Sequence, residues 1–195
     1  MSIHLFKHNQ QAYRAVTAML EKEKMAAVIH PTGTGKSLIA FKLAEENPSK
    51  HFLWLSPSEY IYQTQLEKLN MKFPNIQFMS YSRLMKNEDS IETLHLDYII
   101  LDEFHRCGAQ EWGRSVRKLL DTYPNAKRLG LSATNIRYLD NQRNMAEEIF
   151  DGKIASEMTL GEAIVREILP EPKYVIAMYS YQKELEQLKK RIRTL

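Results

Sequence analysis

The segment from Met25 to Ser37, MAAVIHPTGTGKS, constrains the fold of this chain more than any other part of the sequence. A short apolar run leads into a loop with two glycines, and a helical pattern starts near Gly35. Gly33 and Gly35 have no Cβ, so the backbone can bend tightly and direct its N–H groups toward a phosphate. The unpaired N–H groups and the positive dipole end of the following helix also favour an anion. The segment therefore predicts a buried strand, a phosphate-binding loop and a helix.

Lys36 and Ser37 supply the polar chemistry that such a loop needs. Lys36 provides a positive charge that can reach the β- and γ-phosphates, and Ser37 provides a hydroxyl for Mg²⁺. His30 stands where the strict G-x-x-x-x-G-K-[ST] pattern has its first glycine. A GKS match alone is also compatible with a turn and a surface helix. The apolar strand before the loop, its two glycines and the apolar helix after it favour phosphate binding.

Composition limits the class of protein. The 195 residues suffice for one domain with a substantial core and a small appendage, and we expect a domain over 1–155 and a C-terminal extension over 156–195. The net charge of +3 neither requires nor opposes a nucleic-acid partner. The single cysteine, Cys107, suits a reducing cytosol, and no apolar run approaches the ~20 residues of a membrane span. Since a signal-peptide pattern is also lacking, we expect a cytoplasmic protein without a membrane partner.

Apolar and amphipathic segments alternate along the rest of the chain. The patterns predict further strands over 52–55, 76–79, 98–101, 128–131 and 174–178. They predict helices over 10–22, 59–69, 110–120, 141–150 and 160–168, and a basic helix from residue 182. Strands that alternate with helices imply right-handed crossovers and a parallel sheet, and therefore an α/β fold.

Polar clusters follow five of the predicted strands at the point where each strand ends. They cover residues 31–37, 56–58, 80–83, 102–105 and 132–134. In open parallel sheets, ligands bind at the carboxyl ends of the strands. We therefore expect these clusters to lie along one edge of the sheet and to form the functional site.

Asp102 and Glu103 follow the apolar strand at 98–101 and complete the chemistry of the phosphate-binding loop. Asp102 would hold Mg²⁺ through water, together with Ser37, and Glu103 would polarise the water that attacks the γ-phosphate. A lone acidic pair at a strand end is otherwise a solvated feature. Its position, roughly 65 residues after the loop, favours the functional role.

His105 and Cys107 lie just beyond this acidic pair. His105 lacks the His or Cys neighbours of a zinc site. If the strands at 98–101 and 128–131 are neighbours, it would lie near Ser132 and Thr134 and form a hydrogen-bonded relay from the nucleotide. Cys107 has no evident base beside it, so we expect it to be inert.

Together these residues resemble the first RecA-like domain of superfamily 2 helicases, in the DEAD/DEAH-box and restriction-enzyme translocase group. Residues 30–37 resemble motif I, 102–105 resemble motif II in its DExH form, and 130–134 resemble motif III. The resemblance implies a P-loop NTPase with a RecA-like three-layer sandwich, a mostly parallel central sheet, and ATP and Mg²⁺ as cofactors. It assigns nucleotide binding to Thr32, Gly33, Thr34, Gly35, Lys36 and Ser37, the metal to Ser37 and Asp102, catalysis to Glu103, Lys36 and Asp102, and coupling to His105, Ser132 and Thr134.

Weaker motifs extend the resemblance. Residues 9–11 resemble the Q motif, in which Gln10 would contact the adenine edge through its donor and acceptor. Residues 55–58 and 80–84 resemble motifs that hold the sugar–phosphate backbone of DNA or RNA without reading its sequence. The contacts implied there are Ser56, Pro57, Ser80, Tyr81 and Arg83.

The family also has a second RecA-like domain, whose arginine finger completes the site. One such domain takes ~150 residues, so we expect this chain to belong to a longer protein and, alone, to bind ATP weakly and hydrolyse it slowly without unwinding duplexes. The leading hypothesis is the ATPase domain of a helicase or translocase. One alternative is an ATP-gated binding module without motor activity. Another is a small-molecule kinase, which the Asp-Glu pair and motif III disfavour.

Overall fold

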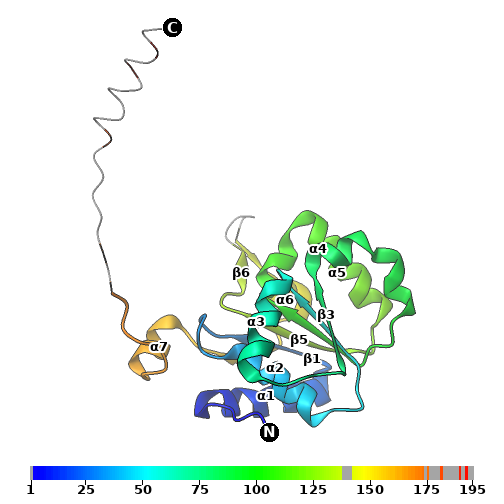
Figure 1. Cartoon of the computed structure of the whole chain (residues 1–195), viewed down its shortest axis with the longest axis horizontal. Coiled ribbons are helices and arrows are strands. Elements are labelled where there is room, and N and C mark those ends of the chain that lie inside the picture. The colour runs from blue at the N-terminus through cyan, green and yellow to red at the C-terminus, as the bar shows by residue number, and fades with distance from the viewer. Residues whose placement is uncertain are drawn as a thin grey trace.

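A six-stranded parallel sheet forms the centre of the molecule (Figure 1). The computed structural model describes residues 2–137 and 142–173 and four isolated positions, 175, 181, 189 and 192. The strand order is β3-β2-β4-β5-β1-β8, and each neighbouring pair runs parallel. The strands are β1 (Met25–Ile29), β2 (Phe52–Ser56), β3 (Ile76–Ser80), β4 (Tyr98–Asp102), β5 (Lys127–Ser132) and β8 (Ile154–Glu157).

Helices cover both faces of the sheet and bury an apolar layer on each side. Side chains alternate across a strand, so in β1 Ala26 and Val28 face one layer whereas Ala27 and Ile29 face the other. The first layer packs against α1 (Lys7–Glu23), α2 (Lys36–Glu46) and α3 (Glu59–Leu69). The second packs against α4 (Tyr81–Lys86), α5 (Gln110–Thr122) and α6 (Met145–Phe150). This arrangement confirms the predicted α/β three-layer sandwich.

The structure corrects two predicted helices. The helix expected over 141–150 begins at Met145, because the Asn144 side chain accepts hydrogen bonds from the N–H groups of Ala146 and Glu147 and so caps the helix there. The helix expected over 160–168 is α7 (Leu160–Val165), which ends before Glu167 adopts a left-handed φ of 54°.

Several elements had no counterpart among the predictions. They are α4, two 3₁₀ segments η1 (Glu88–Thr93) and η2 (Phe104–Gly108), strand β8, and an antiparallel pair of β6 (Ile136–Arg137) and β7 (Arg143–Asn144). The expected domain boundary after residue 155 falls within β8, which pairs with β1. The strand expected over 174–178 and the basic helix from residue 182 lie outside the described ranges.

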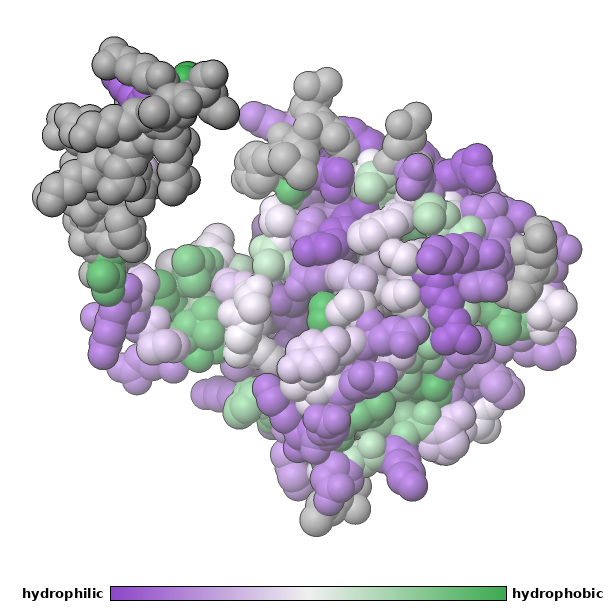
Figure 2. Space-filling model, turned by 45° about the horizontal axis from the view of Figure 1, so that its top comes forward, coloured by the Kyte–Doolittle hydropathy of each residue, from purple (hydrophilic) through white to green (hydrophobic). Residues whose placement is uncertain are grey.

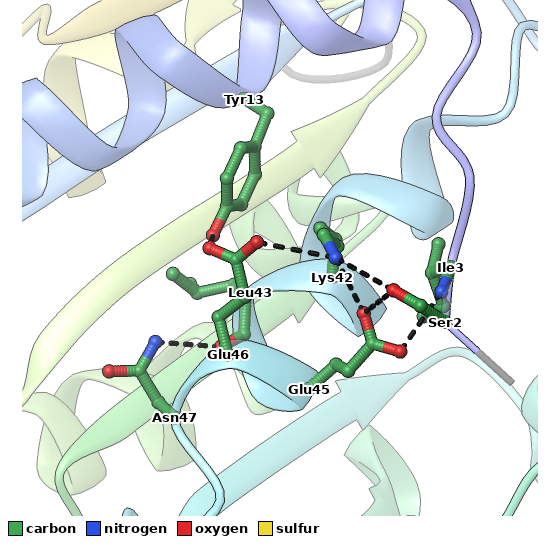
Figure 3. Close-up of polar contacts among 8 residues, drawn as sticks. All are labelled: Ser2, Ile3, Tyr13, Lys42, Leu43, Glu45, Glu46 and Asn47. Carbon is green, nitrogen blue, oxygen red and sulfur yellow. Dashed lines mark hydrogen bonds and ion pairs between the residues drawn. The ribbon is translucent and has the colours of Figure 1, made fainter.

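The N-terminal segment and α1 are fastened to α2 by a polar cluster (Figure 3). Tyr13 donates to a Glu46 carboxylate oxygen at 2.6 Å, and burial together with this bond raises the pKa of Tyr13. Lys42 donates to Glu45 at 2.7 Å, and Glu45 accepts the backbone N–H of Ile3 at 2.9 Å. Because α2 directly follows the glycine loop, this cluster also fixes where α1 begins relative to that loop.

Helix α7 lies to one side of the sandwich (Figure 1). A capping box starts it, in which Thr159 and Glu162 bond each other's backbone N–H. Leu160 and Val165 of this helix are exposed hydrophobic residues. Figure 2 shows hydrophobic surface on the part of the molecule at its left. Within 2–137 and 142–173, no helix is both long enough and apolar enough to cross a membrane.

Gly130 in β5 provides the first test of this packing. A Cβ there would lie 2.4 Å from Phe150 Cζ and 2.9 Å from Phe104 Cδ1. We expect Gly130→Ala to lower the free energy of unfolding by about 1–3 kcal/mol through overpacking, as measured by urea unfolding. Gly161→Ala is the matched control, because a Cβ there meets only Thr159 Oγ1 at 4.0 Å. A Gly130→Ala chain as stable as the wild type would contradict the packing described.

Candidate active site

The loops after β1 and β4 line one cavity of about 520 Å³. The start of α2 contributes Lys36 and Ser37, and the end of β4 contributes Asp102, followed by Glu103. Although β5 lies between β1 and β4, all three strands end at the same edge of the sheet. The cavity wall also includes Thr32, Gly33, Gly35, Leu38 and Phe41, and from α3 Ile61, Gln65, Lys68 and Leu69. The predicted phosphate-binding loop and the predicted acidic pair therefore lie together.

The glycine loop has the backbone conformation that an anion cradle needs. Gly33 and Gly35 have φ angles of 92° and 80°, and Gly35 precedes the first residue of α2. A Cβ at Gly35 would lie 2.9 Å from Asn9 Nδ2, so only glycine fits there without displacement. The Thr34 hydroxyl donates to the Pro31 carbonyl at 2.8 Å and closes the turn. The loop thus suits the phosphate groups of a nucleotide.

Two side chains of α1 contact the backbone carbonyls of this loop. Asn9, fully buried, donates to the carbonyls of Thr34 at 2.9 Å and Gly35 at 3.2 Å, and His8 Nε2 lies 2.8 Å from the Thr34 carbonyl oxygen. Gln10, the predicted adenine contact, is exposed and donates to the Leu5 carbonyl at 3.0 Å. The residues 9–11 therefore do flank the loop, but the direct contact comes from Asn9, which the sequence could not distinguish from its neighbours.

The cavity lining includes two buried ionisable side chains, Lys36 and Asp102. Lys36 Nζ donates to the Pro31 carbonyl at 3.3 Å; burial lowers its pKa, while Glu103 and Asp102 act to raise it. Burial, followed by the charge of Glu103, raises the pKa of Asp102 to about 7. The Ser37 hydroxyl and the Asp102 carboxylate are hard oxygen donors of the type that Mg²⁺ prefers, so this donor set fits the predicted metal.

A close contact joins Glu103 to His105, and hydrogen bonds lead from His105 to the end of β5. His105 Nδ1 lies 2.8 Å from Ser132 Oγ and 3.4 Å from Glu103 Oε2. Ser132 Oγ donates its one hydrogen to the Thr134 carbonyl at 2.6 Å, so at the histidine contact Nδ1–H donates and Ser132 accepts. Burial lowers the pKa of His105. The predicted proximity of His105, Ser132 and Thr134 is confirmed.

The predicted nucleic-acid contacts divide into surface and buried residues. Pro57, Ser80 and Arg83 are partly or fully exposed, and Arg83 lies 3.6 Å from a Glu59 carboxylate oxygen. Ser56 and Tyr81, by contrast, are fully buried. The ring of Tyr81 stacks on Trp112, and its hydroxyl donates a 2.8 Å hydrogen bond to the Asp102 carbonyl. These contacts hold the side chain inside the protein. Neither of these two side chains can contact a DNA or RNA strand unless the protein rearranges.

His30 links the start of the glycine loop to β8. It is 1% exposed, and its Nε2 lies 2.8 Å from Ser156 Oγ. Burial, with smaller contributions from His8, Lys36 and Arg166, lowers the pKa of His30 to about 4. The imidazole is therefore neutral at pH 7 and takes the place of the absent glycine as a packed, hydrogen-bonded side chain.

Comparison with protein families shows which family the chain matches. The model of the family described as type III restriction enzyme, res subunit, matches residues 2–75 and 67–137, which include the glycine loop, the acidic pair and the end of β5. No curated protein sequence matches the chain.

Solved structures with the same fold include a restriction-modification enzyme and two helicases. The ATP-dependent type ISP restriction-modification enzyme LlaBIII bound to DNA has 17% identity and a TM-score of 0.62, over 85% of this chain and 16% of that chain. The Pyrococcus furiosus Hef helicase domain has 16% identity and a TM-score of 0.59, over 88% and 44%. The helicase MrfA bound to DNA has 18% identity and a TM-score of 0.53, over 78% and 27%. This chain therefore spans less than half the length of each.

The buried neutral His30 predicts a pH-dependent stability. Its pKa is 6.5 in an ordinary environment and about 4 in the folded chain, so between these values the unfolded state binds more protons. The contribution of neutral His30 to the free energy of unfolding is therefore fully present above pH 6.5. It is lost as the pH decreases toward 4, which lowers the free energy of unfolding by up to about 3 kcal/mol. We expect His30→Asn to show a shallower loss than the wild type in urea unfolding at pH 7.5, 6, 5 and 4.5. His95→Asn, at an exposed position, is the matched control, and parallel curves for wild type and His30→Asn would refute this account.

Proposed function

Since this chain belongs to the family of the type III restriction enzyme res subunit, and forms a RecA-like domain of the superfamily 2 helicase type, we propose that it is the ATP-binding domain of a nucleic-acid-dependent ATPase. In this proposal a helicase or translocase hydrolyses ATP with Mg²⁺ to drive movement on, or remodelling of, DNA or RNA. The observation that carries the proposal is the single cavity lined by Lys36, Ser37, Asp102 and Glu103.

Each residue of that cavity has a distinct role in the proposal. The N–H groups of residues 32–35 and the Lys36 ammonium bind and orient the phosphates. Ser37 and Asp102 hold Mg²⁺, which when bound neutralises charge on the β- and γ-phosphate oxygens. Glu103 orients the attacking water and accepts its proton. Gln10, at the start of α1, remains the proposed contact for adenine.

We assign communication with nucleic acid to the series of side-chain contacts that starts at Glu103. A change at Glu103 reaches His105 and then Ser132 and Thr134 through the contacts of 2.6–3.4 Å described above. The partly exposed Pro57 and Ser80 and the exposed Arg83 are the proposed backbone contacts, supported by DNA-bound enzymes among the similar folds. A second RecA-like domain in a longer, cytoplasmic protein would complete the cleft and supply an arginine finger.

Two substitutions test the proposed division of labour. Lys36→Ala removes a charged hydrogen-bond donor, and we expect about 10–100-fold weaker binding of a fluorescent ATP analogue. Glu103→Gln removes the proton acceptor but keeps the shape, and we expect ATP binding to persist while hydrolysis falls by about 10²–10⁴-fold. Binding is measured by fluorescence anisotropy and hydrolysis by phosphate release.

The Glu103→Gln result also separates the proposal from its alternative, an ATP-gated binding module without motor activity. Such a module depends on nucleotide occupancy rather than turnover, so Glu103→Gln would leave its DNA or RNA affinity and its response to ATP unchanged. Unimpaired phosphate release in Glu103→Gln would argue against the assigned water-activating role.

The 195-residue chain by itself should be a slow enzyme. An arginine finger contributes about 10³–10⁵-fold to the rate in related nucleotide hydrolases, and the proposal assigns this group to a second domain. We therefore expect slow ATP hydrolysis, with or without DNA or RNA, and no strand separation in a duplex-unwinding assay. Efficient unwinding by this chain alone would refute the need for a second domain.

A further inference from the structure

Gln65 connects α3 to the start of α2 across the cavity. Its Nε2 donates to Ser37 Oγ at 3.0 Å, and the two residues are 28 positions apart in the sequence. Gln65 lines the same cavity as Lys36, Asp102 and Glu103. The hydroxyl assigned above to the metal is thus already oriented by a side chain from outside the sequence motifs.

The oxygen of the Gln65 amide lacks a hydrogen-bond partner among the described residues. Oε1 is buried and, within the part of the chain that the structure describes, has no hydrogen-bond partner. Turning the amide over would place Oε1 on Ser37 and leave Nε2 unpaired instead, so either orientation leaves one polar atom unsatisfied. An unpaired buried polar atom costs about 1–3 kcal/mol, and such atoms in native structures are usually explained by a ligand, an ion or a water.

The surroundings of Gln65 do not account for this polar atom. The cavity lining includes the apolar Leu38, Phe41, Ile61 and Leu69 and also charged side chains such as Lys68, but no described residue hydrogen-bonds Oε1. No residue of α3 is fully buried, so dense packing does not force the amide into place. The unpaired oxygen therefore points to a role in the filled site rather than in folding.

We propose that Gln65 is a positioning residue for the Mg²⁺·nucleotide site, an inference that rests on the proposed function. One end of its amide orients the Ser37 hydroxyl, and the free end accepts a hydrogen bond from a water that Mg²⁺ retains. Protein-bound Mg²⁺ usually keeps several waters. Partners that orient metal ligands typically change metal affinity by 10–100-fold when removed.

The test compares Gln65→Met, which keeps the length but removes both polar ends, with the wild type. Binding of a fluorescent ADP analogue to the full 195-residue chain is measured as Mg²⁺ is titrated, and again in excess EDTA. We expect Gln65→Met to need about 10-fold or more Mg²⁺ for half-saturation and to bind the analogue in EDTA as the wild type does. Gln65→Glu, which keeps an acceptor, should retain a stronger response to Mg²⁺ than Gln65→Met.

Gln63→Met is the matched control, because Gln63 lies on the same helix but is exposed, and it should titrate as the wild type does. Thermal unfolding without nucleotide adds a second readout: Gln65→Met should be at least as stable as the wild type, since it removes an unpaired buried atom. Lower stability with weaker binding also in EDTA would assign Gln65 a structural role and overturn the proposal. An unchanged Mg²⁺ titration would overturn only the proposal for Gln65. A wild-type chain that binds no nucleotide would overturn the proposed function as well.

Discussion

The parallel pairing of β5 with both β1 and β4 is the constraint on which the site depends. Ile29 pairs with Ser132, and Asp102 pairs with Leu131, so the three strands end at the same level and their loops leave the sheet side by side. Gly130 keeps β5 in this place because the rings of Phe104 and Phe150 occupy the space of a side chain. The phosphate-binding loop, the acidic pair and the relay from Glu103 to Thr134 are therefore brought together by strand register.

Burial then gives the assembled groups their electrostatic character. Lys36 and Asp102 are 7% and 5% exposed, and the loss of hydration disfavours the charged form of each, as their shifted pKa values record. The charged form of each is therefore less stable in this cavity than in water. A polyanion that binds Lys36 and a cation that binds Asp102 would both be favoured in such a place, which is the combination that a metal–nucleotide complex provides.

Side chains from outside the motifs attach the surrounding helices to this centre. Asn9 fastens α1 to the glycine loop, Gln65 joins α3 to Ser37, and the Tyr81 hydroxyl joins α4 to the backbone of Asp102. Helices α3 and α4 also carry or border the exposed residues assigned to nucleic acid. A shift of the loops on filling the site would therefore be transmitted to these helices through single, well-defined hydrogen bonds.

The sequence by itself determined the layered α/β fold and the residues of the glycine loop and acidic pair, because apolar periodicity and glycine positions are local properties. It did not determine strand β8 or the burial of Tyr81, each of which depends on partners distant in the chain. It also did not show that Asn9 bonds the glycine loop, since adjacent amides on a polar helix start differ only in the direction they face after packing. Which polar side chain reaches the site, and which is covered, was decided by the tertiary structure, because burial and hydrogen-bond partners exist only once the layers have come together.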